Sequence, residues 1–198
     1  MPLNITSYGS DQALAALMRT GEQPEPTLPQ QIIDRNTDIF GEVLNAHQVV
    51  DRIVSDVRQR GDEAIRHYTR VYDGRDLGTF EVEREEWDAA LARISPELQA
   101  ALELAAGRIR DFHEKQKREN WFDSSELGMF GQIIRPLQRV GIYTPGGSAA
   151  LPSSLLMVAI PARVAGVEEV IVAAPPRGDE GIPDVILAAA AIAGVDRV

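Results

Sequence analysis

Before residue 120, apolar residues recur mostly with the spacing of helices. Val49, Ile53 and Val57 lie four positions apart, which predicts a helix with one buried stripe that ends at Gly61. The remaining pattern predicts a helix over residues 62–72, a short alternating strand at 78–83 and a helix over 85–94. The longest helix is predicted to begin with the cap and proline at 95–97 and to have a solvated end at 114–119. A loop or hairpin is predicted at 121–130.

Residues 138–174 carry the pattern that organises the second part of the chain. A β-branched and aromatic run ends at Tyr143, paired glycines follow Pro145, and a helical segment extends from near Ser153 to Gly166. The next run, VEEVIVAA, is apolar enough to predict a strand covered on both faces. A strand, a crossover helix and a strand of these lengths predict a parallel βαβ unit.

The last residues predict that this sheet continues. Residues 182–193 are apolar on nearly every side, as in a helix packed on a sheet, and residues 195–198 resemble the start of a third strand. A sheet that stopped there would leave a long apolar edge unpaired. We therefore expect the chain to be a fragment, with more of the protein beyond Val198.

Composition and charge exclude several classes of protein. The 198 residues are 44% hydrophobic and 25% charged, as in globular proteins, and the formal net charge of −10 argues against a nucleic-acid partner. The absence of cysteine excludes disulfides and cysteine-based zinc sites. The first residues lack the features of a signal peptide, and no run approaches the roughly 18 apolar residues of a membrane span. These features predict a cytoplasmic protein without a membrane partner.

The side chains that could carry chemistry are few. His47, His67 and His113 fall in predicted helices without a second ligand at metal-binding spacing, so structural roles are expected for them. Ser153 and Ser154 lack a neighbouring base and are expected to cap their helix.

The carboxyl ends of parallel strands are where ligands bind in open sheets, and free N–H groups at a helix start attract phosphate. Tyr143, Gly146, Gly147 and Ser153 would lie at that edge. The spacing differs from G-x-G-x-x-G, so a tight turn beside a core tyrosine stays open as an alternative.

A longer stretch resembles a known family. The run RVGIYTPGGSAALPSSLLMVAIPARVAGVEEVIVAAPP, followed by the alanine-rich segment that ends in AGVDRV, is similar to the histidinol dehydrogenase family. DVRQRGDEAIRHYTRVYDG and RIRDFHEKQ extend the likeness back to about Asn45. Val158 stands where that family more often has asparagine.

The resemblance implies an NAD-dependent, zinc-dependent homodimer that oxidises L-histidinol to L-histidine in histidine biosynthesis. It implies that Tyr143 matches a cofactor-contacting tyrosine and that Pro145, Gly146, Gly147 and Ser153 belong to the same cofactor site. The zinc ligands and the catalytic Glu-His pair of such enzymes lie in their second half. They are expected beyond residue 198, so this chain would contain no catalytic and no metal-binding residue and would be inactive alone.

The predicted fold class is α/β, with a helical N-terminal layer followed by an incomplete Rossmann-like parallel sheet with flanking helices. The predicted domains are residues 1–28 (helix and proline-rich linker), 29–130 (mainly helical) and 131–198 (first part of an NAD-binding domain). Two alternatives stay open: a non-catalytic nucleotide-binding or dimerisation module, and a paralogue that oxidises another amino alcohol.

Overall fold

The computed structural model describes residues 28–145, 150–177 and 181–198. The chain divides into two compact units, with the boundary between Leu77 and Gly78.

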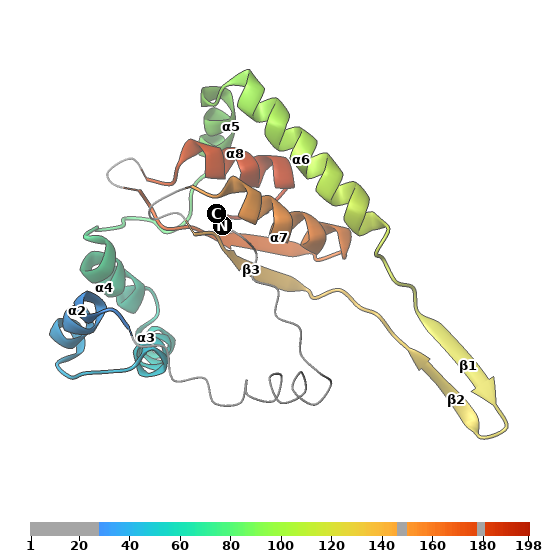
Figure 1. Ribbon diagram of the computed structural model, residues 1–198, viewed down its shortest axis with the longest axis horizontal. Coiled ribbons are helices and arrows are strands. Elements are labelled where there is room, and N and C mark those ends of the chain that lie inside the picture. Colours follow the sequence, from blue (N-terminus) through green and yellow to red (C-terminus); the bar gives the residue numbers. More distant parts are fainter. Residues whose placement is uncertain (1–27, 146–149, 178–180) are drawn as a thin grey trace, which may run out of the picture. The chain divides into compact units, whose positions relative to one another are not determined.

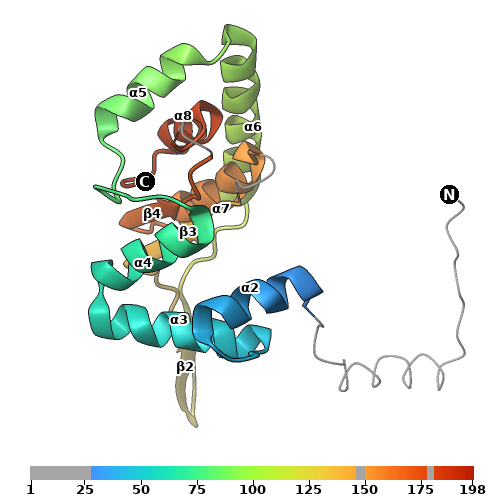
Figure 2. The same cartoon turned by 90° about the vertical axis from the view of Figure 1, so that its left-hand side faces the viewer.

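Within its described residues, 28–77, the first unit contains three helices, α2 (Gln30–Phe40), α3 (Ala46–Arg60) and α4 (Asp62–Asp73) (Figure 2). A capping box starts α3: the Asn45 side chain accepts from the backbone N–H of Gln48, and the Gln48 side chain accepts from that of Asn45, both at 2.9 Å. The buried Asn36 of α2 accepts a hydrogen bond of 3.0 Å from the Tyr72 hydroxyl of α4. The predicted helix that carries Val49, Ile53 and Val57 and ends at Gly61 is confirmed, as is the predicted helix over residues 62–72.

The second unit combines helices with two small sheets, so the α/β class is confirmed (Figure 1). Its elements are α5 (Arg84–Arg93), α6 (Pro96–Glu114), β1 (Trp121–Ser125), β2 (Gly128–Gln132), β3 (Arg139–Tyr143), α7 (Pro152–Val164), β4 (Glu169–Ala173) and α8 (Asp184–Ala193). The predicted cap of the longest helix forms, since the Ser95 hydroxyl accepts from the N–H of Leu98 at 3.2 Å.

The predicted βαβ unit is confirmed. Strands β3 and β4 pair in parallel, in a register that sets Arg139 beside Glu169 and Tyr143 beside Ala173, and α7 connects them. Near the end of the chain, an isolated parallel bridge joins Ile171 of β4 to Arg197. There the N–H of Val172 donates to the carbonyl of Arg197 at 2.8 Å.

Helices α7 and α8 cover one face of the β3–β4 sheet (Figure 1). Crossovers between parallel strands are right-handed in nearly all proteins, and two successive right-handed crossovers in one direction place both helices on the same face. The core therefore forms between this face and the helices. It includes Ile142, Val170 and Val172 from the strands, Leu155, Leu156 and Ile160 from α7, Ile186 and Leu187 from α8, and Trp87 and Leu102 from α5 and α6.

The prediction that the second strand is covered on both faces is wrong for the described chain. Burial alternates along β4, where Val170 and Val172 are buried while Ala173 is exposed and Ile171 is half-buried. The physical reason is that the helices of this unit lie on a single face. The opposite face, which also carries Gly141 and Tyr143, is open to solvent.

The predicted short strand at residues 78–83 is also wrong, because this segment is irregular. Its backbone nevertheless contacts the end of the chain, since the N–H of Val82 donates to the carbonyl of Val198 at 2.8 Å. The indole N–H of the buried Trp87 then donates to the carbonyl of Val82 at 3.1 Å. These tertiary bonds fix the segment without a strand ladder.

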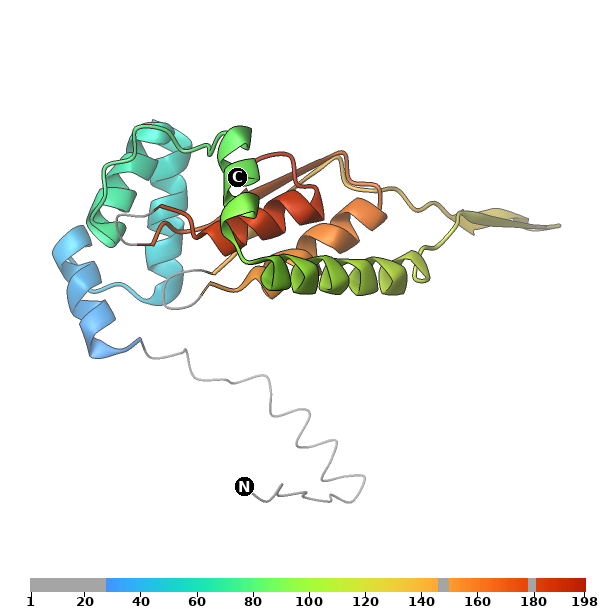
Figure 3. The same ribbon diagram turned by 90° about the horizontal axis from the view of Figure 1, so that it is seen from above.

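Residues 121–132 form a hairpin in which β1 and β2 pair antiparallel, with Trp121 beside Gln132 and Ser125 beside Gly128. Every residue of both strands is exposed. The hairpin extends away from the helices of its unit (Figure 3).

Candidate functional site

The candidate site lies where β3 and β4 end. The N–H of Thr144 donates to the carbonyl of Ala173 at 2.9 Å, so the two strands finish together at one edge of the sheet. Tyr143 points to the open face and is 71% exposed, whereas Ile142 and Thr144 on either side of it are buried. Pro145 is exposed as well. The tyrosine ring is thus presented to solvent rather than packed into the core.

The buried hydroxyl of Thr144 is a feature that sequence reasoning missed. The residue is fully buried, and its hydroxyl oxygen has no hydrogen-bond partner in the part of the chain that the structure describes. A buried hydroxyl without a partner costs about 1–3 kcal/mol. The signal in the sequence was a polar residue between a buried strand and a proline-glycine loop.

The start of α7 contributes to the same edge. The helix begins at Pro152 after Leu151 and has no side-chain cap, so the prediction that Ser153 and Ser154 cap it is wrong. Proline fits the first helical position because its ring fixes φ and it has no N–H to satisfy. Ser153 therefore lies in the first turn, where it is exposed.

The first turn of α7 contains no acidic residue, so nothing there neutralises the positive end of the helix dipole. The start of α8 at the same edge differs, because Asp184 occupies its first turn and pairs with Arg93 at 2.6 and 2.9 Å. The hydrogen bond from Arg93 lowers the pKa of Asp184 below its ordinary value. Of these two helix starts, α7 is the one suited to an anionic group.

Three of the five predicted cofactor residues can be placed. Tyr143 is the last residue of β3 and Pro145 lies two residues beyond it, while Ser153 lies in the first turn of α7. All three residues therefore lie at the carboxyl edge of the sheet. Gly146 and Gly147 lie outside the described residues. Their roles, like those of the other three, stay predictions.

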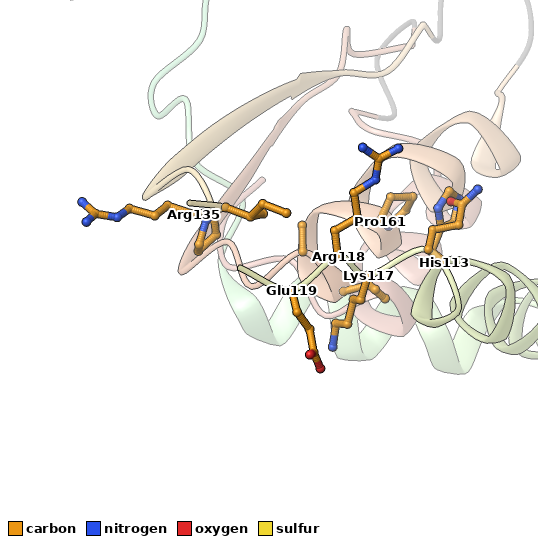
Figure 4. A pocket seen from close by; sticks show the side chains of 11 residues that line it. His113, Lys117, Arg118, Glu119, Arg135 and Pro161 are labelled. Atoms are coloured by element: carbon orange, nitrogen blue, oxygen red, sulfur yellow. The ribbon is translucent and has the colours of Figure 1, made fainter. Parts of the chain in front are cut away.

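A hollow of about 490 Å³ lies at the other end of α7 and is a weaker candidate. Its lining includes His113, Arg118, Arg135 and Pro161. In Figure 4 the side chains of His113, Arg118 and Arg135 point in different directions, so they do not converge on one ligand.

No group of three or more histidine, aspartate or glutamate side chains is placed to bind a metal within residues 28–145, 150–177 and 181–198. His47, His67 and His113 lie on three separate helices, α3, α4 and α6. The described residues therefore do not fit a zinc site. Among the described helices, none has the length and apolar character needed to cross a membrane.

Comparison with known proteins identifies the family. The family model described as histidinol dehydrogenase matches residues 40–198, which is most of the chain. The chain belongs to the histidinol dehydrogenase family. Curated relatives named histidinol dehydrogenase include one from Geobacter metallireducens, 42% identical over 99% of this chain and 42% of the relative. Another, from Syntrophotalea carbinolica, is 51% identical over 94% of this chain and 39% of the relative.

A solved structure supports the same family. The crystal structure of histidinol dehydrogenase from Elizabethkingia anophelis matches with a TM-score of 0.71 and 33% identity, covering 78% of this chain and 36% of that one. The chain thus spans about two-fifths of the length of the histidinol dehydrogenases it matches. The Tyr-x-Pro-Gly-Gly motif that carried the resemblance begins at the open edge described above.

Proposed function

We propose that this chain is the part of a histidinol dehydrogenase that contributes to NAD binding. The whole enzyme would oxidise L-histidinol to L-histidine in histidine biosynthesis, as a cytoplasmic homodimer. The observation that carries the proposal is the exposed ring of Tyr143, at the sheet edge where α7 begins without an acid or a side-chain cap.

Each residue at this edge suits one part of a dinucleotide. The ring of Tyr143 is free to pack against the cofactor, and the N–H groups in the first turn of α7, at Ser153, are suited to a phosphate. Gly146 and Gly147 would allow the backbone to approach the ligand closely. When bound, NAD accepts the hydride from the alcohol. The described residues do not fit zinc, so its ligands would lie elsewhere in the whole enzyme.

The proposal is tested by calorimetric titration of the 198-residue chain with NAD. Tyr143→Ala should weaken NAD binding about two- to tenfold, because a stacked aromatic ring contributes about 0.5–1.5 kcal/mol. Tyr143→Phe should retain most of the affinity. Phe112→Ala is the matched control, since it removes an aromatic ring that is 60% exposed on α6. Equal affinities for the Tyr143→Ala and Phe112→Ala chains would contradict the proposal.

A second variant tests the phosphate site. Ser153→Asp places an acid in the first turn of α7, where it stabilises the helix dipole by about 0.3–1 kcal/mol but repels a phosphate. We expect weaker NAD binding together with equal or higher stability, a combination that general unfolding would not produce. Tighter NAD binding by this variant would contradict a phosphate at this helix start.

The chain alone should neither bind zinc tightly nor oxidise histidinol, since its described residues form no metal site. The measurement is the zinc content of the purified protein, together with NADH formation in the presence of histidinol. A stoichiometric amount of zinc would contradict the inference that the ligands lie elsewhere in the enzyme.

A further inference from the structure

A groove of about 440 Å³ is lined by residues of α5, α6 and α8 in the second unit. Helices α5 and α6 lie on either side of α8 (Figure 2). The base of the groove includes Ala191 and Ile192, which belong to the last turn of α8. Asp184 begins the same helix at the carboxyl edge of the sheet, so the base of the groove lies at the opposite end of α8 from the candidate cofactor residues.

The walls of the groove follow from helical spacing. Each wall is one face of a helix, because its residues recur at steps of four and three; they are Arg84, Asp88 and Leu91 on α5, and Glu103, Gly107 and Arg110 on α6. Gly107 leaves open space in the α6 wall, since a Cβ at this position would meet no heavy atom within 4 Å apart from its own helix backbone. The walls are thus charged at their rims and leave room between them.

Two of the four charged side chains are engaged by their own chain. The guanidinium of Arg84 lies over the ring of Trp87 at 4.7 Å, and Glu103 accepts a hydrogen bond of 2.9 Å from a side chain one turn earlier. The other two, Asp88 and Arg110, have no ion-pair or hydrogen-bond partner among the residues that the structure describes. They carry opposite charges and line the same groove, but they do not pair with each other.

This lining does not suit a protein segment. The large apolar side chains that are exposed in the described chain include none from the groove, since Leu91 and Ile192 are half-buried. The cores of protein interfaces are apolar and depleted of charge. A polypeptide laid over the groove would remove Asp88 and Arg110 from water, and an unpaired charge is costly to bury. A small ligand that carries both charges would instead satisfy the two groups.

We propose that this groove binds a free α-amino acid with an apolar side chain. The ligand's carboxylate accepts from the guanidinium of Arg110, which can donate two parallel hydrogen bonds, and its ammonium donates to the carboxylate of Asp88. Its side chain occupies the space over Gly107, beside Leu91 and Ile192. The volume of about 440 Å³ lies within the range of about 300–1,000 Å³ that is usual for small-molecule sites. This site is additional to the proposed cofactor edge.

Titration of the unmutated 198-residue chain with L-leucine tests the site without any substitution. L-leucine should bind saturably, with a dissociation constant of about 1 mM or below. 3-Methylbutylamine lacks the carboxylate and 4-methylpentanoate lacks the ammonium, so each should bind at least about threefold more weakly. Absence of saturable binding by L-leucine, or equal affinity for the three compounds, would overturn the proposal.

Matched variants then locate the bound carboxylate. Arg110→Gln should raise the dissociation constant for L-leucine at least about threefold. Arg108→Gln is the control, because Arg108 is also exposed on α6 but does not line the groove, and it should leave the constant within about twofold of the parent. Equal dissociation constants for the two variants would overturn the assigned role of Arg110 and with it the site.

A third variant separates loss of the site from loss of folding. Gly107→Leu fills the space proposed for the ligand's side chain and should abolish saturable binding of L-leucine. The variant should be at least as stable against urea as the parent, because leucine favours a helix interior more than glycine does. Unchanged binding by a folded Gly107→Leu chain would overturn the proposal. The NAD titration uses the other end of α8, so the cofactor proposal stands or falls separately.

Discussion

Arg163 joins the end of α7 to two later parts of the chain, and its loss should be costly. Its guanidinium donates to the carbonyls of Gly194 at 2.8 Å, Glu168 at 3.0 Å and Val167 at 3.2 Å. It also pairs with the carboxylate of Asp196. These bonds hold the crossover from α7 into β4 and the turn after α8 together.

Asp196 extends the connection into the sheet. Its carboxylate accepts the backbone N–H of Val170 at 2.6 Å, while its own N–H donates to the carbonyl of Val170 at 2.9 Å. Removing Arg163 therefore takes one donor from each of three carbonyls and leaves the Asp196 carboxylate with only the N–H of Val170 among the bonds named here. Water can satisfy some of them, since the side chain of Arg163 is 24% exposed.

We expect Arg163→Met, which keeps the aliphatic stem, to lower the free energy of unfolding by about 2–4 kcal/mol. Hydrogen bonds to charged groups contribute about 1.5–3 kcal/mol each, and partial hydration reduces their sum. Arg139→Met is the control. Arg139 pairs with Glu169, but its side chain is 67% exposed, and exposed pairs contribute about 0–1 kcal/mol.

The assay is urea unfolding in a Trp121→Phe background, where fluorescence reports on the buried Trp87 in the same unit. Far-ultraviolet circular dichroism before unfolding checks that each variant is folded. If Arg163→Met and Arg139→Met lose the same free energy of unfolding, the four bonds of Arg163 do not act as a structural unit and the reasoning fails.

Two further predictions concern single polar groups. Thr144→Val should raise the free energy of unfolding by about 1 kcal/mol in the same assay, because it replaces a buried hydroxyl that lacks a partner in the described chain. A loss of stability in this variant would show that the hydroxyl is hydrogen-bonded. Asp184→Asn should destabilise the chain by about 0.5–1 kcal/mol at neutral pH and by less as the pH is lowered. The pKa of Asp184 is lowered in the folded chain by its bond to Arg93, so its contribution is complete above the ordinary value of 3.8 and is lost as the pH falls through the folded value. A difference from the parent that stays constant down to low pH would contradict this role.

Local patterns were sufficient to predict the helices and the βαβ unit. The helical spacing of Val49, Ile53 and Val57 corresponds to α3, and the cap-and-proline signal at 95–97 corresponds to the start of α6. These features depend on neighbours within a few residues, so the sequence contains them directly.

Features that depend on tertiary placement were not predictable in the same way. Residues 78–83 alternate like a strand, but their contacts to Val198 and Trp87 determine their conformation. The exposed face of β4 follows from the position of α7 and α8 on one side, although Glu169 at the start of the strand was a hint. The start of α7 was assigned one residue too late because serine was favoured over the proline rule at Pro152.

The sequence predicted which residues form the candidate site, because the family resemblance identified them. It did not predict how they are arranged, because their arrangement depends on where the parallel strands end. That geometry separates two tasks. Arg163 and Asp196 act at the amino end of β4, where they fix the crossover, while Tyr143 and the start of α7 lie at its carboxyl end. A single charged residue in the otherwise uncharged α7 segment PSSLLMVAIPARV could have identified Arg163 as a structural residue. Because the two ends are held by different bonds, a substitution at Arg163 should reduce stability with little effect on NAD affinity in the folded protein. Tyr143→Ala should reduce NAD affinity with little effect on stability.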